Sequence, residues 1–146
     1  MKPLGRASRK PIFVDTSAFF ALVDRTDRFH DLAVRFVESN QQFLTTSNLV
    51  AQETVTLIRM RLGHEQAVKA GKRLFEQEMV PLIRVTPSDE RKAWELLKRY
   101  ADKRFSFADC TRFVLMHRLG LQTAFAFDQD FRQFGGWTVY PETQFD

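Results

Sequence analysis

Four acidic residues occupy positions where most chains carry neutral side chains, and their types suit a metal site. Asp15 and Asp128 each directly follow an apolar run with the composition of a β-strand. Glu53 lies inside a stretch with helical spacing, and Asp109 lies at the start of another. Carboxylates that converge repel one another unless a proton or a cation lies between them. Hard oxygen ligands favour Mg²⁺ or Mn²⁺, so the pattern predicts a divalent-metal site and phosphodiester hydrolysis.

The elements that must position these acids alternate between strand and helix along the chain. This alternation predicts an α/β fold with a mostly parallel central sheet flanked by helices. Ligands of such open sheets bind at the carboxyl ends of the strands, where two aspartates and two helical acids would converge. We expect strands at 11–14, 43–45, 80–85, 123–127 and 137–140, and helices at 17–22, 31–39, 48–62, 64–77, 86–100, 106–119 and 130–134.

Each acid taken alone also has a purely structural interpretation. Asp15 could cap the helix that follows it, and Asp109 completes a capping box with Ser106. Asp128 could be a turn residue, and Asp130 could serve the same turn or add a fifth acid at the rim of the site. The conjunction of all four acids at one sheet edge favours the metal site.

Glu53 is the acid that is hardest to explain by local structure. It lies on the same helix face as apolar residues four positions before and four positions after it. A carboxylate on an apolar face is costly without a partner. The structural interpretation needs an arginine, and Arg59 and Arg61 are near in sequence.

Other metal and nucleotide sites find little support in the sequence. His30, His64 and His117 show no spacing typical of zinc ligands, and no glycine-rich phosphate loop is present. The 146 residues suffice for one domain, which we expect at 11–146 behind a flexible basic tail at 1–10. The net charge of +4 suits a polyanionic substrate.

The compartment is predicted from cysteine content and hydropathy. Cys110 is the only cysteine, so no disulfide within the chain can form, which favours a reducing environment. No apolar run approaches the length of a membrane span, and the run 18–23 is too short for the core of a signal peptide. We therefore expect a cytoplasmic protein without a membrane partner.

Four segments carry a family resemblance in order and approximate spacing. They are 13–18, then 45–50 leading to Glu53, then 106–109, then 126–131. On these segments the sequence resembles the PIN-domain ribonucleases and, within them, the VapC toxins of bacterial and archaeal toxin–antitoxin pairs. The resemblance covers residues 12–140. Cys110 departs from it, since relatives often carry alanine there.

The resemblance implies a three-layer α/β sandwich and a Mg²⁺-dependent (or Mn²⁺-dependent) endoribonuclease. Asp15 and Asp109 would be the main metal ligands, and Glu53 and Asp128 would complete the acidic set. Ser17 and Ser106 match small polar positions that orient the carboxylates, and Asp130 would support the site. The resemblance also implies an RNA substrate, a cognate antitoxin and a homodimer.

Basic residues in loops near the expected site are candidates for holding the RNA backbone. They are Arg25, Arg28, Lys103 and Arg104. The alternative for each is an ordinary solvated surface charge. In the expected reaction, one or two metal ions activate a water for in-line attack, which leaves a 3′-hydroxyl and a 5′-phosphate.

Two rival functions follow from the same residues. The segment Asp128-Gln129-Asp130 mimics the nucleophile motif of haloacid-dehalogenase phosphatases, but that motif belongs near the start of its fold. A non-catalytic RNA- or partner-binding module with a degenerate site is the rival from another class. An incomplete acid set would favour it, whereas the set in this sequence is complete.

Overall fold

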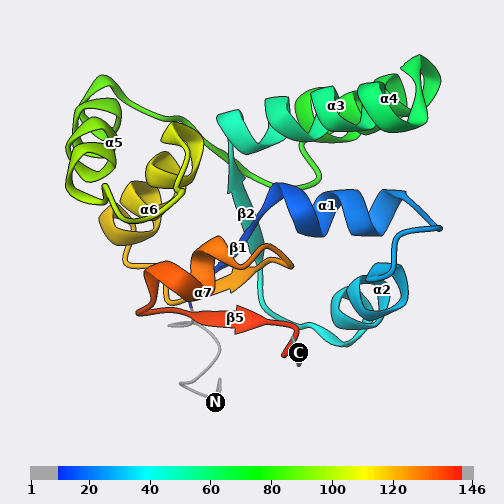
Figure 1. Cartoon of the computed structure of the whole chain (residues 1–146). Coiled ribbons are helices and arrows are strands. Elements are labelled where there is room, and N and C mark those ends of the chain that lie inside the picture. Colours follow the sequence, from blue (N-terminus) through cyan, green and yellow to red (C-terminus); the bar gives the residue numbers. More distant parts are fainter. Residues whose placement is uncertain (1–9, 143–146) are drawn as a thin grey trace, which may run out of the picture.

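The computed structural model describes residues 10–142 (Figure 1). The expected tail lies almost wholly outside the described residues, so the division into a tail and one domain at 11–146 stays a prediction. The strands are β1 (Ile12–Val14), β2 (Leu44–Ser47), β3 (Leu82–Ile83), β4 (Thr123–Phe125) and β5 (Thr138–Tyr140). The helices are α1 (Thr16–Val23), α2 (His30–Ser39), α3 (Asn48–Leu62), α4 (His64–Gly71), the π-helical turn η1 (Lys72–Glu76), α5 (Pro87–Arg99), α6 (Phe107–Arg118) and α7 (Asp130–Phe134).

The five strands form one parallel sheet in the order β3-β2-β1-β4-β5. The chain starts in the middle of the sheet, adds β2 and β3 on one side, and then crosses to β4 and β5 on the other. The crevice at the carboxyl ends of β1 and β4 is therefore the topological switch point, where open α/β sheets bind their ligands. The expected α/β class and parallel sheet are confirmed.

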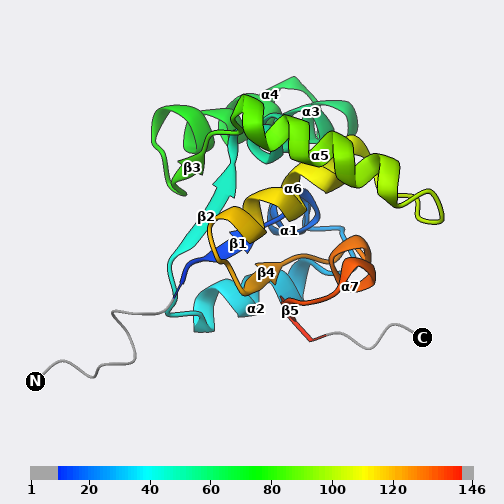
Figure 2. The ribbon, with the colours of Figure 1, turned by 90° about the vertical axis from the view of Figure 1, so that its left-hand side faces the viewer.

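Strand β1 supplies both faces of the sheet with core residues, because successive side chains of a strand point to opposite faces. Phe13 packs in a cluster with α5, α6 and α7, whereas Ile12 and Val14 pack in a second cluster with α1 and α2. In Figure 1, α5 and α6 lie on one side of β1 and β2, with α1 and α2 on the other. Seen from the α5–α6 side, α6 passes in front of β1 and β4 (Figure 2). This arrangement is the expected three-layer sandwich.

A smaller cluster joins α3 and α4 to α1. Phe20 of α1, Ile58 of α3 and Ala67 of α4 pack together in it. This contact packs α3, which carries Glu53, against α1. No described helix combines the length and the apolar character that crossing a bilayer requires.

Helices α5 and α6 begin with the same N-terminal capping motif. Thr86 and Asp89 form a capping box at α5, and Ser106 and Asp109 form one at α6. Asp89 is buried and also binds Arg118, whose Nε and Nη2 donate to its carboxylate at 2.8 and 2.9 Å. The box at α6 was expected from the sequence, and the same spacing of a hydroxyl and an acid three residues apart is present at Thr86 and Asp89.

Two expected strands are longer in the sequence pattern than in the fold. The expected strand 80–85 has only Leu82–Ile83 in the sheet, because the amide of Val85 donates to the side chain of Asn48 instead of the ladder (2.9 Å). The expected strand 123–127 ends at Phe125. The amide of Phe127 donates to Ser17 Oγ (2.9 Å), which turns the chain away from the sheet.

The other element boundaries differ by smaller amounts. The second strand extends to Ser47, whose side chain still caps α3 by accepting from Val50. The expected helix 64–77 changes at Gly71 from α-helical to π-helical hydrogen bonding. Gly71 itself has helical backbone angles, so this glycine does not end the helix.

Candidate functional site

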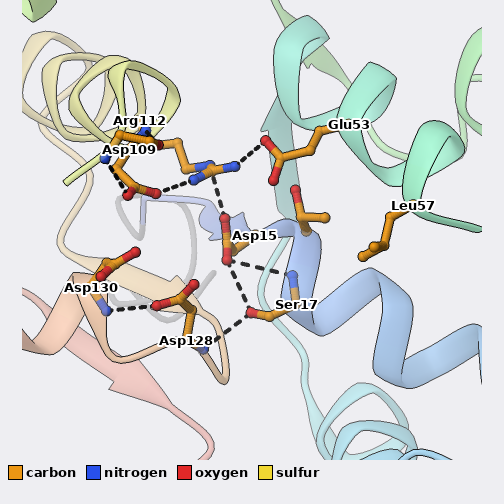
Figure 3. Close-up of a pocket in the computed structure, with 10 residues that line it drawn as sticks. Asp15, Ser17, Glu53, Leu57, Asp109, Arg112, Asp128 and Asp130 are labelled. Atoms are coloured by element: carbon orange, nitrogen blue, oxygen red, sulfur yellow. Dashed lines mark hydrogen bonds and ion pairs between the residues drawn. The ribbon is translucent and has the colours of Figure 1, made fainter. Parts of the chain in front are cut away.

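A cavity of about 320 Å³ opens at the carboxyl ends of β1 and β4 (Figure 3). It brings together all four acids expected from the sequence and all three expected supporting residues. The three remaining lining residues, Thr16, Leu57 and Arg112, were not expected from the sequence to belong to the site. The lining consists of Asp15, Thr16, Ser17, Glu53, Leu57, Ser106, Asp109, Arg112, Asp128 and Asp130.

Asp15 links the sheet to α1. Its amide donates to Phe125 O (2.9 Å), and its side chain caps α1 by accepting from the amide of Ser17. Ser17 Oγ donates to the same oxygen, Asp15 Oδ2, at 3.0 Å. The capping role proposed as an alternative is therefore real, yet it uses only Oδ2. The other oxygen, Oδ1, is left for the pocket.

The two carboxylate oxygens of Asp109 also have separate partners. Its Oδ2 accepts from the amide of Ser106 (2.8 Å), and its own amide donates to Ser106 Oγ (3.0 Å). Its Oδ1 lies 2.5 Å from Nη1 of Arg112. A capping box therefore fixes the carboxylate on its helix and leaves one oxygen turned toward the cavity.

Arg112 of α6 lies at the centre of the acid set (Figure 3). Besides Asp109, it contacts Glu53 through Nη2 and Asp15 through Nε, with 3.0 Å between Nε and Asp15 Oδ1. Nε and Oδ1 form an ion pair without the alignment of a hydrogen bond, and both atoms are buried. Converging carboxylates need a cation between them, and in this structure a guanidinium provides it.

Glu53 reaches the pocket from α3 and has the most exposed side chain of the three acids bound to Arg112, at 44%. The sequence suggested Arg59 or Arg61 as an alternative partner. The structure assigns that place to Arg112, which lies on a different helix and far along the chain. Glu53 thus faces the other acids across the cavity.

Asp128 lies three residues beyond the end of β4, so it belongs to a loop and not to the strand end itself. Ser17 Oγ holds this loop by accepting from the amides of Phe127 (2.9 Å) and Asp128 (3.2 Å). Asp128 Oδ1 in turn accepts from the amide of Asp130 at 2.9 Å. One serine hydroxyl therefore joins Asp15 to the Asp128 loop.

Burial and charge shift the ionisation of the site in opposite directions. Burial raises the pKa of Asp15 above its usual range, although the charge of Arg112 acts to lower it. Burial likewise raises the pKa of Glu53, again against the effect of Arg112. Burial acts to lower the pKa of Arg112, but the charges of Asp15, Glu53 and Asp109 outweigh it and raise that pKa. Arg112 is therefore permanently charged.

The pKa of Asp130 is strongly raised. Partial burial, a hydrogen bond with Asp109 and the charges of Asp109 and Asp128 raise its pKa to about 7. Its ordinary value is 3.8. The folded state therefore binds a proton that the unfolded state releases between these values, so stability from this group is complete below about pH 4 and is lost as pH rises through 7.

Asp130→Asn should remove this loss of folding stability at high pH. We expect the metal-free variant to be more stable than the wild type at about pH 8 by roughly 1 kcal/mol, a value kept small because the side chain is partly exposed to solvent. At about pH 4 the two proteins should be equally stable. Urea unfolding in EDTA at both pH values measures the difference. An advantage of the variant that is the same at both pH values would contradict the assignment.

The donor set fits a hard divalent cation. The acids offer oxygen ligands, and buried Asp15 Oδ1 has no hydrogen-bond donor. Within residues 10–142, however, no three acidic, histidine or cysteine side chains are arranged as a ready metal cage. Arg112 stands among the acids instead, so the fit holds for an arrangement in which the guanidinium moves from the oxygens it contacts.

The four basic residues expected to hold RNA lie outside the cavity. Arg25, Arg28, Lys103 and Arg104 are exposed, and none of them lines the pocket. The guanidinium of Arg28 lies over the ring of Phe29 at 4.4 Å. Their contact with RNA stays a prediction.

Sequence reasoning missed Arg112, although a signal for it exists. Arg112 stands one residue before the buried apolar run 113–116 and three after Asp109, on the buried side of its helix. A charge in such a place is costly unless it is paired. The same argument that singled out Glu53 therefore applies to Arg112, and each explains the other.

Comparison with known proteins now identifies the family. Residues 12–136 match the PIN domain, and the chain therefore belongs to the PIN domain family. The chain is 42% identical over 131 residues to the protein named 23S rRNA-specific endonuclease VapC20 of Mycobacterium tuberculosis, in two strains. The match covers 90% of this chain and 99% of that protein.

A solved structure agrees with the sequence match. The crystal structure of Mycobacterium tuberculosis VapC20, described as a sarcin–ricin loop cleaving toxin, is similar to this chain with a TM-score of 0.83 and 41% identity. The similarity covers 89% of this chain and 99% of that one. The resemblance to PIN-domain ribonucleases and VapC toxins drawn from the sequence is confirmed.

Proposed function

We propose that this protein is a metal-dependent endoribonuclease that hydrolyses RNA phosphodiester bonds as the toxin of a VapBC-type pair. The observation that carries the proposal is the convergence of five carboxyl groups in one cavity at the switch point of a PIN fold. Membership of the PIN family and the similarity to VapC20 support it. The complete acid set speaks against the rival reading of a degenerate, non-catalytic binding module.

In this proposal Asp15 and Asp109 are the main ligands for Mg²⁺ or Mn²⁺, and Glu53 and Asp128 complete the set. When bound, the metal lowers the pKa of a water and neutralises charge on the scissile phosphate. Ser17 orients Asp15 and the Asp128 loop together, and the capping box of Ser106 orients Asp109. Asp130, with a pKa of about 7, can hold or release a proton beside Asp109 at neutral pH.

We propose the sarcin–ricin loop of 23S rRNA as the substrate, because the solved relative is described as cleaving that loop and the two chains match over nearly their full length. The test uses two RNA hairpins of equal length and composition, one with the sarcin–ricin loop and one with its loop order rearranged. In Mg²⁺, we expect cleavage within the first loop at a rate at least about tenfold above the second. The products should carry a 3′-hydroxyl and a 5′-phosphate.

The outcomes separate the activity from its specificity. Equal cleavage of both hairpins would leave an endoribonuclease with another target. Binding of the hairpins without cleavage in Mg²⁺ or Mn²⁺ would contradict the enzyme and favour the non-catalytic module. A DNA hairpin of the same sequence serves as the control for RNA selectivity.

We further propose a cytoplasmic homodimer with a cognate antitoxin as partner. Exposed large apolar side chains support a protein interface, and several lie along α3, α4, η1 and the segment after η1, namely Met60, Val68, Phe75 and Met79. Light scattering that gives a monomer mass at micromolar concentration would count against the homodimer. Co-purification with a small DNA-binding protein encoded beside it would support the antitoxin.

A further inference from the structure

Arg112 occupies the oxygens that a metal would need. In both Asp15 and Asp109, one carboxylate oxygen is already held by the helix cap, through Ser17 and Ser106. The second oxygen of each faces Arg112, at 3.0 Å from Nε for Asp15 and 2.5 Å from Nη1 for Asp109. A cation that joins these two carboxylates through their uncapped oxygens therefore meets the guanidinium in the same place.

The contacts of Arg112 with Asp15 and Asp109 are buried, but the contact with Asp15 is not a hydrogen bond. The side chains of Arg112, Asp15 and Asp109 are 7, 4 and 10% exposed, so little water screens their charges. Yet the contact between Nε and Asp15 Oδ1 is not aligned as a hydrogen bond, which leaves a buried donor and a buried acceptor unsatisfied. Buried polar atoms of this kind cost free energy, so Asp15 Oδ1 gains from a better partner.

Charge explains why such a partner can displace the arginine. One guanidinium faces three bound carboxylates, with Asp128 and Asp130 beside them, so the cavity keeps an excess of negative charge. A divalent cation is drawn to this excess, while the fixed positive charge of Arg112 opposes its entry. Removal of that charge should strengthen metal binding more than any loss of carboxylate order weakens it.

We propose that Arg112 is a positioning residue that holds Asp15, Glu53 and Asp109 together in the metal-free protein and competes with the divalent metal for Asp15 and Asp109. A metal that binds Asp15 and Asp109 therefore displaces Arg112 from these two carboxylates. Arg112 keeps the acids from repelling one another before metal arrives, at the cost of a lower affinity for the metal. This inference rests on the proposed metal-dependent function.

The test compares Arg112→Met with the wild type by calorimetric titration with MnCl₂ in the absence of RNA. We expect the variant to bind Mn²⁺ at least about tenfold more tightly, because a positive charge next to the ligands is removed. Its metal-free form should melt at a lower temperature, because three carboxylates lose their common partner. Its rise in melting temperature on addition of Mn²⁺ should exceed that of the wild type.

Arg118→Met is the matched control. Arg118 lies on the same helix and also binds a buried aspartate of a capping box, Asp89, but does not line the cavity. Its replacement should lower the melting temperature and leave the affinity for Mn²⁺ unchanged. A general effect of losing an arginine ion pair would therefore appear in both variants, and competition for metal only in Arg112→Met.

Arg112→Gln tests the same idea if the methionine variant does not fold. Glutamine removes the charge but can still donate hydrogen bonds to the carboxylates, so Mn²⁺ should still bind more tightly than to the wild type. Equal or weaker binding of Mn²⁺ by the folded variant would overturn the role of Arg112. A wild-type protein that binds no Mn²⁺, with or without RNA, would instead contradict the metal site on which the proposed function rests.

Discussion

Asp109→Asn and Asp15→Asn should each reduce RNA cleavage by roughly a thousandfold or more, to the background of the assay. In the proposed site both residues bind the metal through a charged oxygen, and an amide is a poor substitute for that ligand. The amide can still cap a helix, since asparagine caps about as well as aspartate. The loss of cleavage should therefore occur in proteins that remain folded.

The stability of these variants tests whether repulsion among the acids or ion pairing with Arg112 has the larger effect on the metal-free protein. Repulsion among carboxylates alone predicts that neutralising one acid stabilises the metal-free protein. The structure changes this expectation, because Asp15 and Asp109 also pair with Arg112. Relief of repulsion and loss of an ion pair oppose each other, so we expect melting in EDTA to change little, by about 1 kcal/mol or less in unfolding free energy.

Asp89→Asn is the control for both variants. Asp89 has the same place in its capping box as Asp109 and the same type of partner, Arg118, but it lies outside the cavity. This variant should keep full cleavage and the full rise in melting temperature that Mg²⁺ gives the wild type. Full cleavage by Asp109→Asn as well would mean that Asp109 is only a cap.

Removal of divalent metal should also bring cleavage to background, a loss of roughly a thousandfold or more. Among residues 10–142, no histidine lines the cavity, and Arg112, the only cationic lining residue in that part of the chain, cannot act as a base near neutral pH. In the proposed site, a metal held by the acids that line the cavity would lower the pKa of the attacking water. Dialysis against EDTA, followed by addition of Mg²⁺ or Mn²⁺ in excess, measures the loss and the recovery.

Addition of metal should also raise the melting temperature of the protein. A metal that binds only the folded state raises the melting temperature in proportion to the logarithm of its concentration well above the dissociation constant. We expect this rise for the wild type and a much smaller one for Asp15→Asn. Undiminished cleavage in EDTA would exclude metal-assisted hydrolysis and leave the acids and Arg112 to be explained as a structural cluster.

Local sequence determined much of the fold. The capping boxes at Thr86 and Ser106 were predictable because a hydroxyl and an acid three residues apart complete each other within one helical turn. The alternation of strand and helix predicted the parallel sheet and its ligand-binding edge. Strand lengths were less predictable, because the amides of Val85 and Phe127 find side-chain partners from distant segments, Asn48 and Ser17.

For the site, the sequence by itself determined the acids, since Asp15, Glu53, Asp109 and Asp128 stand out by type and position and converge in one cavity. Only the tertiary structure decided what lies between them. Arg112 contacts a strand end, its own helix and a residue 59 positions away, and no local pattern encodes such a pairing. Charges are compensated in space, where side chains from α3, α6 and the end of β1 reach one cavity, so the counter-ion of a buried acid is fixed by the packing of helices and not by their sequence spacing.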